Sequence, residues 1–267
     1  MSYICVPDGT RLRLSQRGAG PAIVLVHGWK MSHRAWDKAF FRLSEKFRVV
    51  AYDLRGMGES DKPDSACDFA EHAADLDFIV NALGLRDVTV VGWSMGCSVT
   101  LSYLAQRPAR VTRAVLLNGP VKLLACPEFP YGISPAYLEG LVDDLVRTWP
   151  ERERAFVSQT FRSPHPEHVD WFTRIALQTP LDVVIRTVMH QAKLDLRQVV
   201  ATADVPLLAM FGRHDPYYSV GLGEWIARTA KRGQLVIFED SAHCPPVEET
   251  EKFVAALADF IAAACVP

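Results

Sequence analysis

Six short apolar runs constrain the fold more than any other feature of the sequence. They cover residues 23–26, 49–52, 88–91, 114–117, 206–211 and 235–238. Each is continuously apolar rather than alternating, as is typical of parallel strands covered on both faces. Helical patterns lie around them, at 35–43, 66–83, 97–106, 220–229 and 249–264. This alternation predicts an α/β fold with a mostly parallel central sheet flanked by helices. Residues 4–6 and 12–15, around Asp8-Gly9, predict an antiparallel hairpin that leads into the sheet.

The segment from residue 118 to residue 203 breaks this alternation. It contains no convincing strand, is rich in aromatic residues and prolines, and is too long for a loop. We interpret it as a helical cap insertion over the carboxyl edge of the sheet. The predicted core domain is then 1–121 together with 204–267, and the predicted cap is 122–203. The alternative is that these residues only add further helices to the core.

Composition excludes several classes of protein. The chain has 267 residues, of which 49% are hydrophobic and 22% charged, as in ordinary globular proteins. A net charge of −2 argues against a nucleic-acid partner. The six cysteines show no metal-ligand spacing and are too few for a disulfide scaffold, so we expect free thiols. We find no secretory leader and no apolar run of about 18 residues, which predicts a cytoplasmic protein without a membrane span.

The segment Gly92-Trp93-Ser94-Met95-Gly96 carries the clearest chemical signal. It follows an apolar run and precedes a helical pattern, the strand–turn–helix setting in which G-x-S-x-G has meaning. The glycines allow a sharp turn that lifts the hydroxyl of Ser94 above the sheet, beside the positive end of a helix. This context predicts that Ser94 is a nucleophile rather than part of a chance turn.

A serine nucleophile needs a base, and the base needs an acid to orient it. Asp215 follows the apolar run 206–211, and His243 follows the run 235–238. Because parallel strands end at one edge of the sheet, we expect both residues to lie near Ser94. The predicted triad is Ser94, Asp215 and His243. His214 and Asp240 are weaker candidates, since each lies too close in sequence to its would-be partner.

The remaining histidines are interpreted as structural or exposed. The His165-Pro-Glu-His168 segment resembles a metal pair, but its proline argues against the helical turn that would align the two rings. We predict no metal and no organic cofactor. The glycine-rich segment from Asp53 to Ser60, DLRGMGES, is interpreted as a structural turn near the site.

Taken together, these motifs resemble the α/β-hydrolase superfamily along almost the whole chain. The resemblance rests on HGW at 27–29, DLRGMGES, GWSMG, GRHDP at 212–216 and SAH at 241–243. Within the superfamily the sequence is most similar to small bacterial serine carboxylesterases. These include aryl esterases with perhydrolase side activity and esterases of the pimeloyl-carrier-protein methyl ester type. The resemblance implies an α/β-hydrolase fold with a helical cap.

The resemblance also implies an oxyanion hole formed by the backbone N–H groups of Trp29 and Met95. A serine at the elbow, rather than the aspartate of related dehalogenases and epoxide hydrolases, argues against an alkyl-enzyme mechanism. Cys97 stands where many relatives have glycine, and Cys244 directly follows the predicted base. These two cysteines are candidates for a contact with each other.

These features predict a serine hydrolase that cleaves carboxylic esters of small to medium, apolar or aromatic substrates. Trp29, Trp93, Trp149 and Trp171 are candidates for the substrate pocket, although the cap aromatics could equally form the cap's own core. A small-molecule ester or lactone is the expected partner. Nine acidic residues outnumber six basic ones over 125–190, which argues mildly against an acidic carrier protein. The sequence gives no indication of the oligomeric state.

Three alternatives stay open. The enzyme could be a lactonase or a carrier-protein methyl ester esterase. It could be a lyase or a cofactor-free oxygenase, with the His–Asp pair acting as a base without an acyl-serine. It could also be a ligand-binding receptor that retains the triad. Detection of an acyl-enzyme separates the hydrolases from the other two classes.

Overall fold

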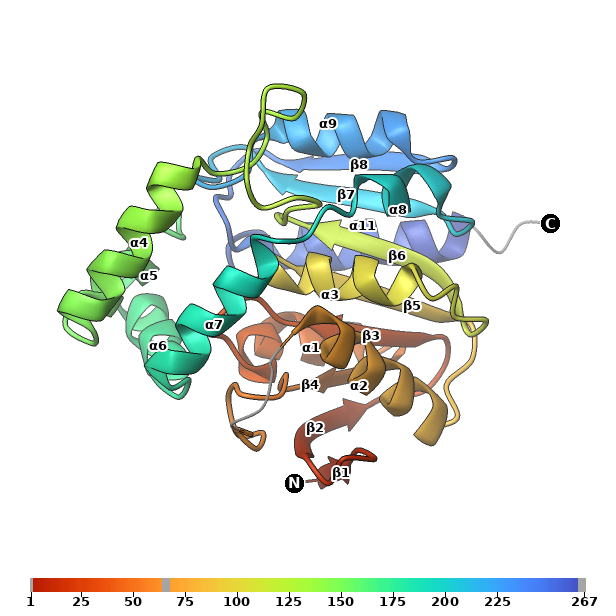
Figure 1. Ribbon diagram of the computed structural model, residues 1–267. Helices are drawn as coiled ribbons and strands as arrows, with labels where there is room; N and C mark the ends of the chain where they lie inside the picture. Colours follow the sequence, from red (N-terminus) through yellow and green to blue (C-terminus); the bar gives the residue numbers. More distant parts are fainter. Residues whose placement is uncertain (1, 64–67, 264–267) are drawn as a thin grey trace.

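The computed structural model describes residues 2–63 and 68–263 (Figure 1). Its centre is one eight-stranded sheet with the order β1-β2-β4-β3-β5-β6-β7-β8. The strands are β1 (Ser2–Cys5), β2 (Arg11–Arg17), β3 (Ala22–Val26), β4 (Arg48–Tyr52), β5 (Val88–Trp93), β6 (Val111–Leu117), β7 (Leu207–Gly212) and β8 (Gly233–Phe238). β2 pairs antiparallel with β1 and β4, and all other neighbouring strands run parallel. The predicted mostly parallel sheet and its leading hairpin are therefore confirmed.

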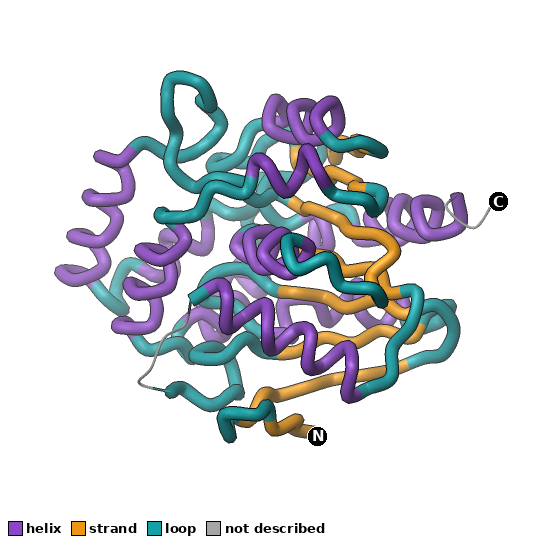
Figure 2. The backbone as a smooth tube through the Cα atoms, turned by 45° about the vertical axis from the view of Figure 1, so that its right-hand side comes forward, coloured by secondary structure: helices purple, strands orange, loops and turns teal. Residues whose placement is uncertain are grey.

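Helices cover both faces of this sheet (Figure 2). One face carries α2 (Phe69–Ala82), α3 (Met95–Leu104), α8 (Arg197–Thr202) and α9 (Val220–Thr229). The other face carries α1 (Asp37–Leu43) and α11 (Thr250–Ala263). Two short helices, η1 (His33–Trp36) and α10 (Pro245–Glu248), precede α1 and α11. Residues 66, 67 and 264 of the predicted helices lie outside the described residues.

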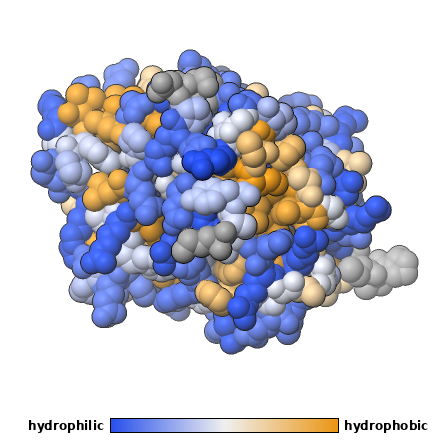
Figure 3. Space-filling view, turned by 90° about the horizontal axis from the view of Figure 1, so that it is seen from below, coloured by the Kyte–Doolittle hydropathy of each residue, from blue (hydrophilic) through white to orange (hydrophobic). Residues whose placement is uncertain are grey.

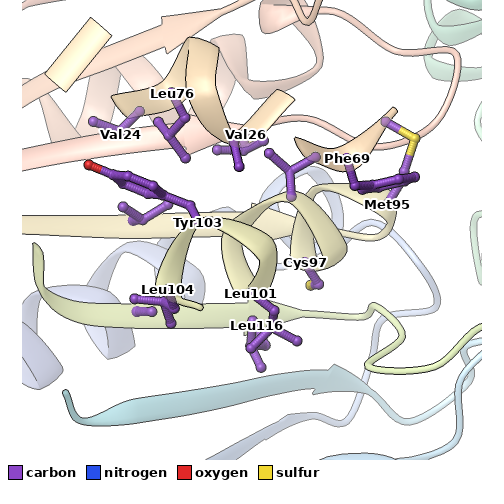
Figure 4. Packing of buried hydrophobic residues seen from close by; sticks show 14 of the residues in the cluster. Val24, Val26, Phe69, Leu76, Met95, Cys97, Leu101, Tyr103, Leu104 and Leu116 are labelled. Carbon is purple, nitrogen blue, oxygen red and sulfur yellow. The ribbon is translucent and has the colours of Figure 1, made fainter. Parts of the chain in front are cut away.

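The double cover explains why the strands read as continuous apolar runs. Ala22, Val24 and Val26 of β3 belong to the cluster beneath α2 and α3. Ile23 and Leu25, which point to the opposite face, belong to the cluster beneath α1 and α11. Figure 4 shows the first cluster, in which Leu76 of α2 lies beside β3 and Leu101 of α3 lies beside Leu116 of β6. Both faces are thus buried, so neither set of alternating positions is polar.

Four helices lie beyond the carboxyl ends of the strands, at the left of Figure 1. They are α4 (Pro135–Thr148), α5 (Glu153–Ser158), α6 (Pro166–Ala176) and α7 (Leu181–Gln191). α8 instead packs against α3 and α9 on the face of the sheet. We therefore propose that the cap consists of α4 to α7, and that α8 belongs to the core rather than to a cap reaching residue 203.

One face of the molecule has a mainly polar surface (Figure 3). Figure 3 shows this face, on which hydrophilic residues predominate and hydrophobic ones gather in limited patches. Within 2–63 and 68–263, no helix combines the length and the apolar character that a membrane crossing requires.

Candidate active site

Ser94 occupies a strained turn between β5 and α3. Its backbone has φ 55° and ψ −121°, a left-handed conformation that is costly for a residue with a Cβ. The turn is held by two hydrogen bonds, from Ser94 N to Leu117 O and from Cys97 N to Ser94 O, each 2.9 Å long. The side chain is half-buried and faces the pocket described below. This is the sharp strand-to-helix turn that the sequence predicted.

The two glycines of the motif are required by close backbone contacts. A Cβ on Gly92 would lie 2.3 Å from the carbonyl oxygen of Gly96. A Cβ on Gly96 would lie 2.3 Å from the carbonyl oxygen of Val26 and 2.8 Å from that of His27. Backbone atoms cannot move aside as a flexible side chain can. Any side chain at these positions therefore pushes α3 away from the sheet.

Replacing Gly96 with alanine is expected to lower the free energy of unfolding by about 1–3 kcal/mol or more, because the added methyl group meets two backbone oxygens. Urea unfolding followed by circular dichroism measures the change. Gly140→Ala is the matched control, since a Cβ there meets nothing within 4 Å. In the interior of α4 it is expected to stabilise the protein by up to about 1 kcal/mol. Equal effects of the two variants would contradict this account of the turn.

His243 and Asp215 are paired, as the sequence predicted. The distance from His243 Nδ1 to Asp215 Oδ2 is 2.8 Å, and the two side chains are 6% and 0% exposed. The second carboxylate oxygen of Asp215 accepts the backbone N–H groups of Tyr217 and Tyr218. An ionised carboxylate only accepts, so Nδ1 carries the proton and Nε2 has a free lone pair. This arrangement would allow the imidazole to accept a proton at Nε2.

Ser94 and His243 line the same pocket. Within the described residues, no hydrogen bond of 3.5 Å or less joins the hydroxyl of Ser94 to the imidazole. Hydrogen bonds between a catalytic nucleophile and its base are often long in the absence of substrate and shorten in the reacting complex. The competing residues point elsewhere: His214 is exposed, and Asp240 pairs with Arg162 on the surface.

Several hydrogen bonds that the sequence did not predict hold the His243 loop in place. Trp93 Nε1 donates to the carbonyl oxygen of His243 at 2.8 Å, and His243 N donates to the carbonyl oxygen of Thr160 at 2.9 Å. Asn118, directly after β6, links the end of β7 to the His243 loop, because its amide oxygen accepts from Gly212 N and its amide nitrogen donates to the carbonyl oxygen of Ala242. Its position directly after a buried apolar run was the only sequence signal that could have identified it.

The predicted oxyanion donors lie on two adjoining segments. Met95 is the first residue of α3, so its N–H has no acceptor within the helix. Trp29 lies in the loop after β3, and among the described residues its backbone N–H has no protein acceptor. Gly28 brings this loop close to the nucleophile, since a Cβ there would lie 3.1 Å from Ser94 Cβ. Both residues line the pocket beside Ser94.

Buried histidines support the surrounding loops. His27 Nε2 accepts the N–H of Leu54 at 3.0 Å, and Nδ1 lies 2.8 Å from the carbonyl oxygen of Gly28. Burial lowers the pKa of His27 to about 4. His72 on α2 is fully buried, and neither of its ring nitrogens has a partner among the described residues. Burial and the nearby Arg55 lower the pKa of His72 to about 3.

These two pKa values predict that stability falls in mild acid. The unfolded chain binds a proton on each histidine near pH 6.5. The folded chain does so only near pH 4 and pH 3, so the stabilisation is complete above pH 6.5 and is lost below it. At pH 5 the expected loss is about 2 kcal/mol per histidine. His72→Leu removes one of them, so its stability relative to wild type should rise by about 2 kcal/mol between pH 7.5 and pH 5.

Urea unfolding at the two pH values measures this difference. His165→Gln is the control, because the side chain of His165 is 60% exposed. An unchanged difference between wild type and His72→Leu would show that His72 is not buried in its neutral form.

The Asp53–Ser60 segment makes a tight turn beside the site. Asp53 accepts hydrogen bonds from both the backbone N–H and the ring of His33, each at 2.6 Å, and from Glu59 N at 2.7 Å. Gly58 has φ +52°, and a Cβ there would lie 2.3 Å from Asp53 Oδ2. The segment thus ties the turn to η1, as expected of a structural element.

A mainly apolar pocket lies between the sheet edge and the cap. It holds about 770 Å³ of space not occupied by protein atoms, including its opening to solvent. The lining comprises Gly28, Trp29, Met31, Trp93, Ser94, Met95, Leu123, Ile133, Tyr137, Leu141, Phe156, Val157, Thr160, Phe172, Val188, Gln191, Tyr217, Tyr218 and His243. Apolar and aromatic side chains predominate among these residues.

Two of the four predicted pocket tryptophans line this pocket, and two lie elsewhere. Trp29 and Trp93 are part of its wall. Trp149 instead lines a neighbouring cavity between α4 and α5. Trp171 is half-buried on α6, with its ring 5.2 Å from that of Phe172. Phe172 reaches the pocket, so Trp171 backs the wall without forming it.

The cysteines and the histidine pair also have defined surroundings. Cys97 Sγ contacts the carbonyl oxygen of Gly92 at 3.1 Å, whereas Cys244 Sγ contacts Thr160 Oγ1 at 3.7 Å. Both are free and buried, and burial raises the pKa of each thiol. The nitrogen Nε2 of His168 lies 3.0 Å from the ammonium of Lys38. Cys67 and Cys265 lie outside the described residues.

Known proteins resemble this chain over nearly all of its length. Pimeloyl-(acyl-carrier protein) methyl ester esterase of Vibrio atlanticus is 30% identical over 256 residues, covering 91% of this chain and 95% of that protein. The AB hydrolase superfamily protein YisY of Bacillus subtilis is 28% identical over 262 residues, covering 97% and 98%. The solved structure of the esterase EaEST from Exiguobacterium antarcticum has a TM-score of 0.93 and 26% identity, covering 97% and 98%. A family model described as the alpha/beta hydrolase fold matches residues 21–250, and the chain therefore belongs to the α/β-hydrolase family.

Proposed function

We propose that this α/β-hydrolase is a serine carboxylic ester hydrolase that acts through an acyl-serine intermediate. The observation that carries the proposal is the 2.8 Å bond between His243 Nδ1 and Asp215 Oδ2. It leaves His243 Nε2 able to accept a proton in the pocket that also contains Ser94. The esterase names of EaEST and of the Vibrio atlanticus relative support the same reaction class.

The proposed reaction has two halves. Ser94 Oγ attacks the ester carbon while His243 Nε2 takes its proton, and Asp215 stabilises the imidazolium. The developing oxyanion accepts hydrogen bonds from the N–H groups of Trp29 and Met95, each worth about 10² to 10³ in rate. His243 then protonates the leaving alcohol. Water, activated by the same imidazole, releases the acid from the serine.

The pocket supports a substrate with apolar groups of small to medium size. Its wall combines aromatic rings, such as Trp29 and Phe156, with aliphatic side chains, such as Leu123 and Val188. An extended charged substituent would lose its hydration there without a charged partner. We therefore propose short- to medium-chain esters and aryl esters as the substrate class.

A series of p-nitrophenyl esters from acetate to decanoate tests this function. We expect turnover that is greatest at short or medium chain length and declines towards decanoate, because the enclosed space is limited. Rapid acid quenching followed by mass spectrometry should show one added acyl group, on the peptide that contains Ser94. An inert wild-type enzyme across the series, with lactones and carrier-bound methyl esters also uncleaved, would overturn the proposal. Ester hydrolysis without an acyl-enzyme would indicate direct attack by water, with His243 as its base, and would overturn the acyl-serine step.

A further inference from the structure

A buried ion pair joins the oxyanion loop to the cap. Lys30 directly follows Trp29, and Glu153 is the first residue of α5. Lys30 Nζ lies 2.8 Å from Glu153 Oε2, and the two side chains are 1% and 2% exposed. Burial lowers the pKa of Lys30 and raises that of Glu153, each against the opposing effect of its partner. Burying the pair carries a desolvation penalty, since both charges have lost their hydration.

Aromatic rings surround the ammonium of Lys30. Its Nζ lies 4.0 Å from the ring centre of Phe156, 4.4 Å from that of Trp29 and 5.8 Å from that of Trp149. Phe156 is on α5, so the cation holds the loop and the helix through both a carboxylate and a ring face. Lys30 itself has φ 61°, a left-handed conformation that its surroundings must maintain.

The same helix reaches the imidazole. Phe156 stacks on Tyr217 with 5.9 Å between ring centres and 25° between planes. Tyr217 in turn meets the ring of His243 edge to face at 5.1 Å. An unbroken series of contacts therefore runs from Lys30 through Phe156 and Tyr217 to His243. On its other side, Lys30 is one peptide unit from the N–H of Trp29.

We propose that Lys30 and Glu153 are positioning residues that clamp α5 onto the oxyanion loop and so align the Trp29 N–H and the His243 ring for reaction. The inference rests on the proposed serine esterase activity. Neither residue is assigned contact with the reacting atoms. The pair acts through its neighbours, which are the loop on one side and the aromatic contacts on the other.

Stability and alignment can be separated by replacing the whole pair. Removing one partner leaves an uncompensated buried charge and destabilises the fold, whereas an apolar pair of similar volume is often neutral or stabilising. A methionine and a leucine fill the space but make no directional bond. If the pair serves only the fold, the double variant Lys30→Met/Glu153→Leu recovers both the stability and the turnover of wild type. If the pair aligns the site, that variant recovers stability but not turnover.

The experiment compares wild type, both single variants, the double variant and Ser94→Ala on the best p-nitrophenyl ester. We expect the double variant to regain the wild-type urea midpoint while kcat stays about 10- to 100-fold lower, since complete loss of one oxyanion donor costs about 10² to 10³. KM should change by less than about threefold. The inhibition constant of an alkyl trifluoromethyl ketone, which forms a tetrahedral oxyanion on the serine, should weaken by about the same factor as kcat.

Two further variants serve as controls. One changes the pair as conservatively as possible, and the other removes an exposed ion pair nearby. Glu153→Gln keeps the shape and a hydrogen bond, and should lower kcat several-fold. Because it leaves the charge of Lys30 without its counter-charge, its urea midpoint should lie between those of wild type and Glu153→Leu. Asp144→Asn/Arg152→Gln removes the neighbouring ion pair of 2.9 Å, whose side chains are 41% and 65% exposed, and should leave kcat unchanged.

The outcomes distinguish this inference from the proposed function. Wild-type kcat in both the double variant and Glu153→Gln would overturn the positioning role while leaving the esterase proposal intact. Wild-type turnover that does not depend on Ser94 would overturn both.

Discussion

Ser94→Ala should abolish the acyl-enzyme and lower kcat for the preferred p-nitrophenyl ester by about 10⁴ to 10⁶. The methyl side chain has no oxygen to attack the ester, so His243 could only activate water directly. Some catalysis should survive, because the oxyanion donors and the pocket still bind the transition state. Initial rates, taken at enzyme concentrations high enough to detect the remaining activity, measure the loss of turnover. The mass of the intact protein after quenching measures the loss of the acyl-enzyme.

Ser102→Ala is the matched control for this variant. Ser102 lies on α3, the helix that follows Ser94, and is not among the residues that line the pocket. It should keep wild-type kcat and wild-type acylation. Substantial turnover by Ser94→Ala would show that another group is the nucleophile, and the role assigned to the strained turn would then be wrong.

Asp215→Asn should lower kcat by about 10⁴ with little loss of folding stability. The amide can still accept the N–H groups of Tyr217 and Tyr218 through its oxygen. Its NH₂ group then faces His243 Nδ1 as a donor, which places the ring proton on Nε2. An imidazole in that tautomer cannot take the proton of the serine. Steady-state kinetics and urea unfolding on the same preparation separate the chemical effect from a structural one.

Asp240→Asn provides the comparison. Asp240 is three residues before His243 and was the alternative acid in the sequence, but its side chain is 76% exposed and pairs with Arg162. Its removal should leave kcat unchanged, because an exposed ion pair contributes little. A large loss of activity in Asp240→Asn with a small one in Asp215→Asn would exchange the two assignments.

The positions of Ser94, Asp215 and His243 in the sequence were sufficient to predict that the three residues lie at one edge of the sheet. Each follows a continuous apolar run, and each run is a strand of one parallel sheet. Parallel strands end at a common edge, so a residue just after any of them has a predictable place. The Asp215–His243 bond is a consequence of this rule combined with the local turn at each strand end.

No such rule predicts which side chains of the cap face the pocket. Trp149 and Trp171 were expected in the pocket on residue type alone, yet one lines a separate cavity and the other packs on Phe172. The direction of a helical side chain depends on how the helix is rotated against its neighbours. Sequence identifies a helix in this segment but not its rotation, and so the wall of the pocket was not predictable.

The sequence by itself determined the central sheet, the sharp turn at Ser94 and the edge on which the site lies, because apolar periodicity and the G-x-S-x-G pattern are both visible over a few consecutive residues. The tertiary structure alone decided the Lys30–Glu153 pair, the links made by Asn118 and the composition of the pocket. Lys30 and Glu153 are 123 positions apart and meet only because α5 docks on the oxyanion loop. Neither residue type nor local pattern distinguishes them from an ordinary surface lysine and glutamate, and their burial follows from packing between segments remote in sequence.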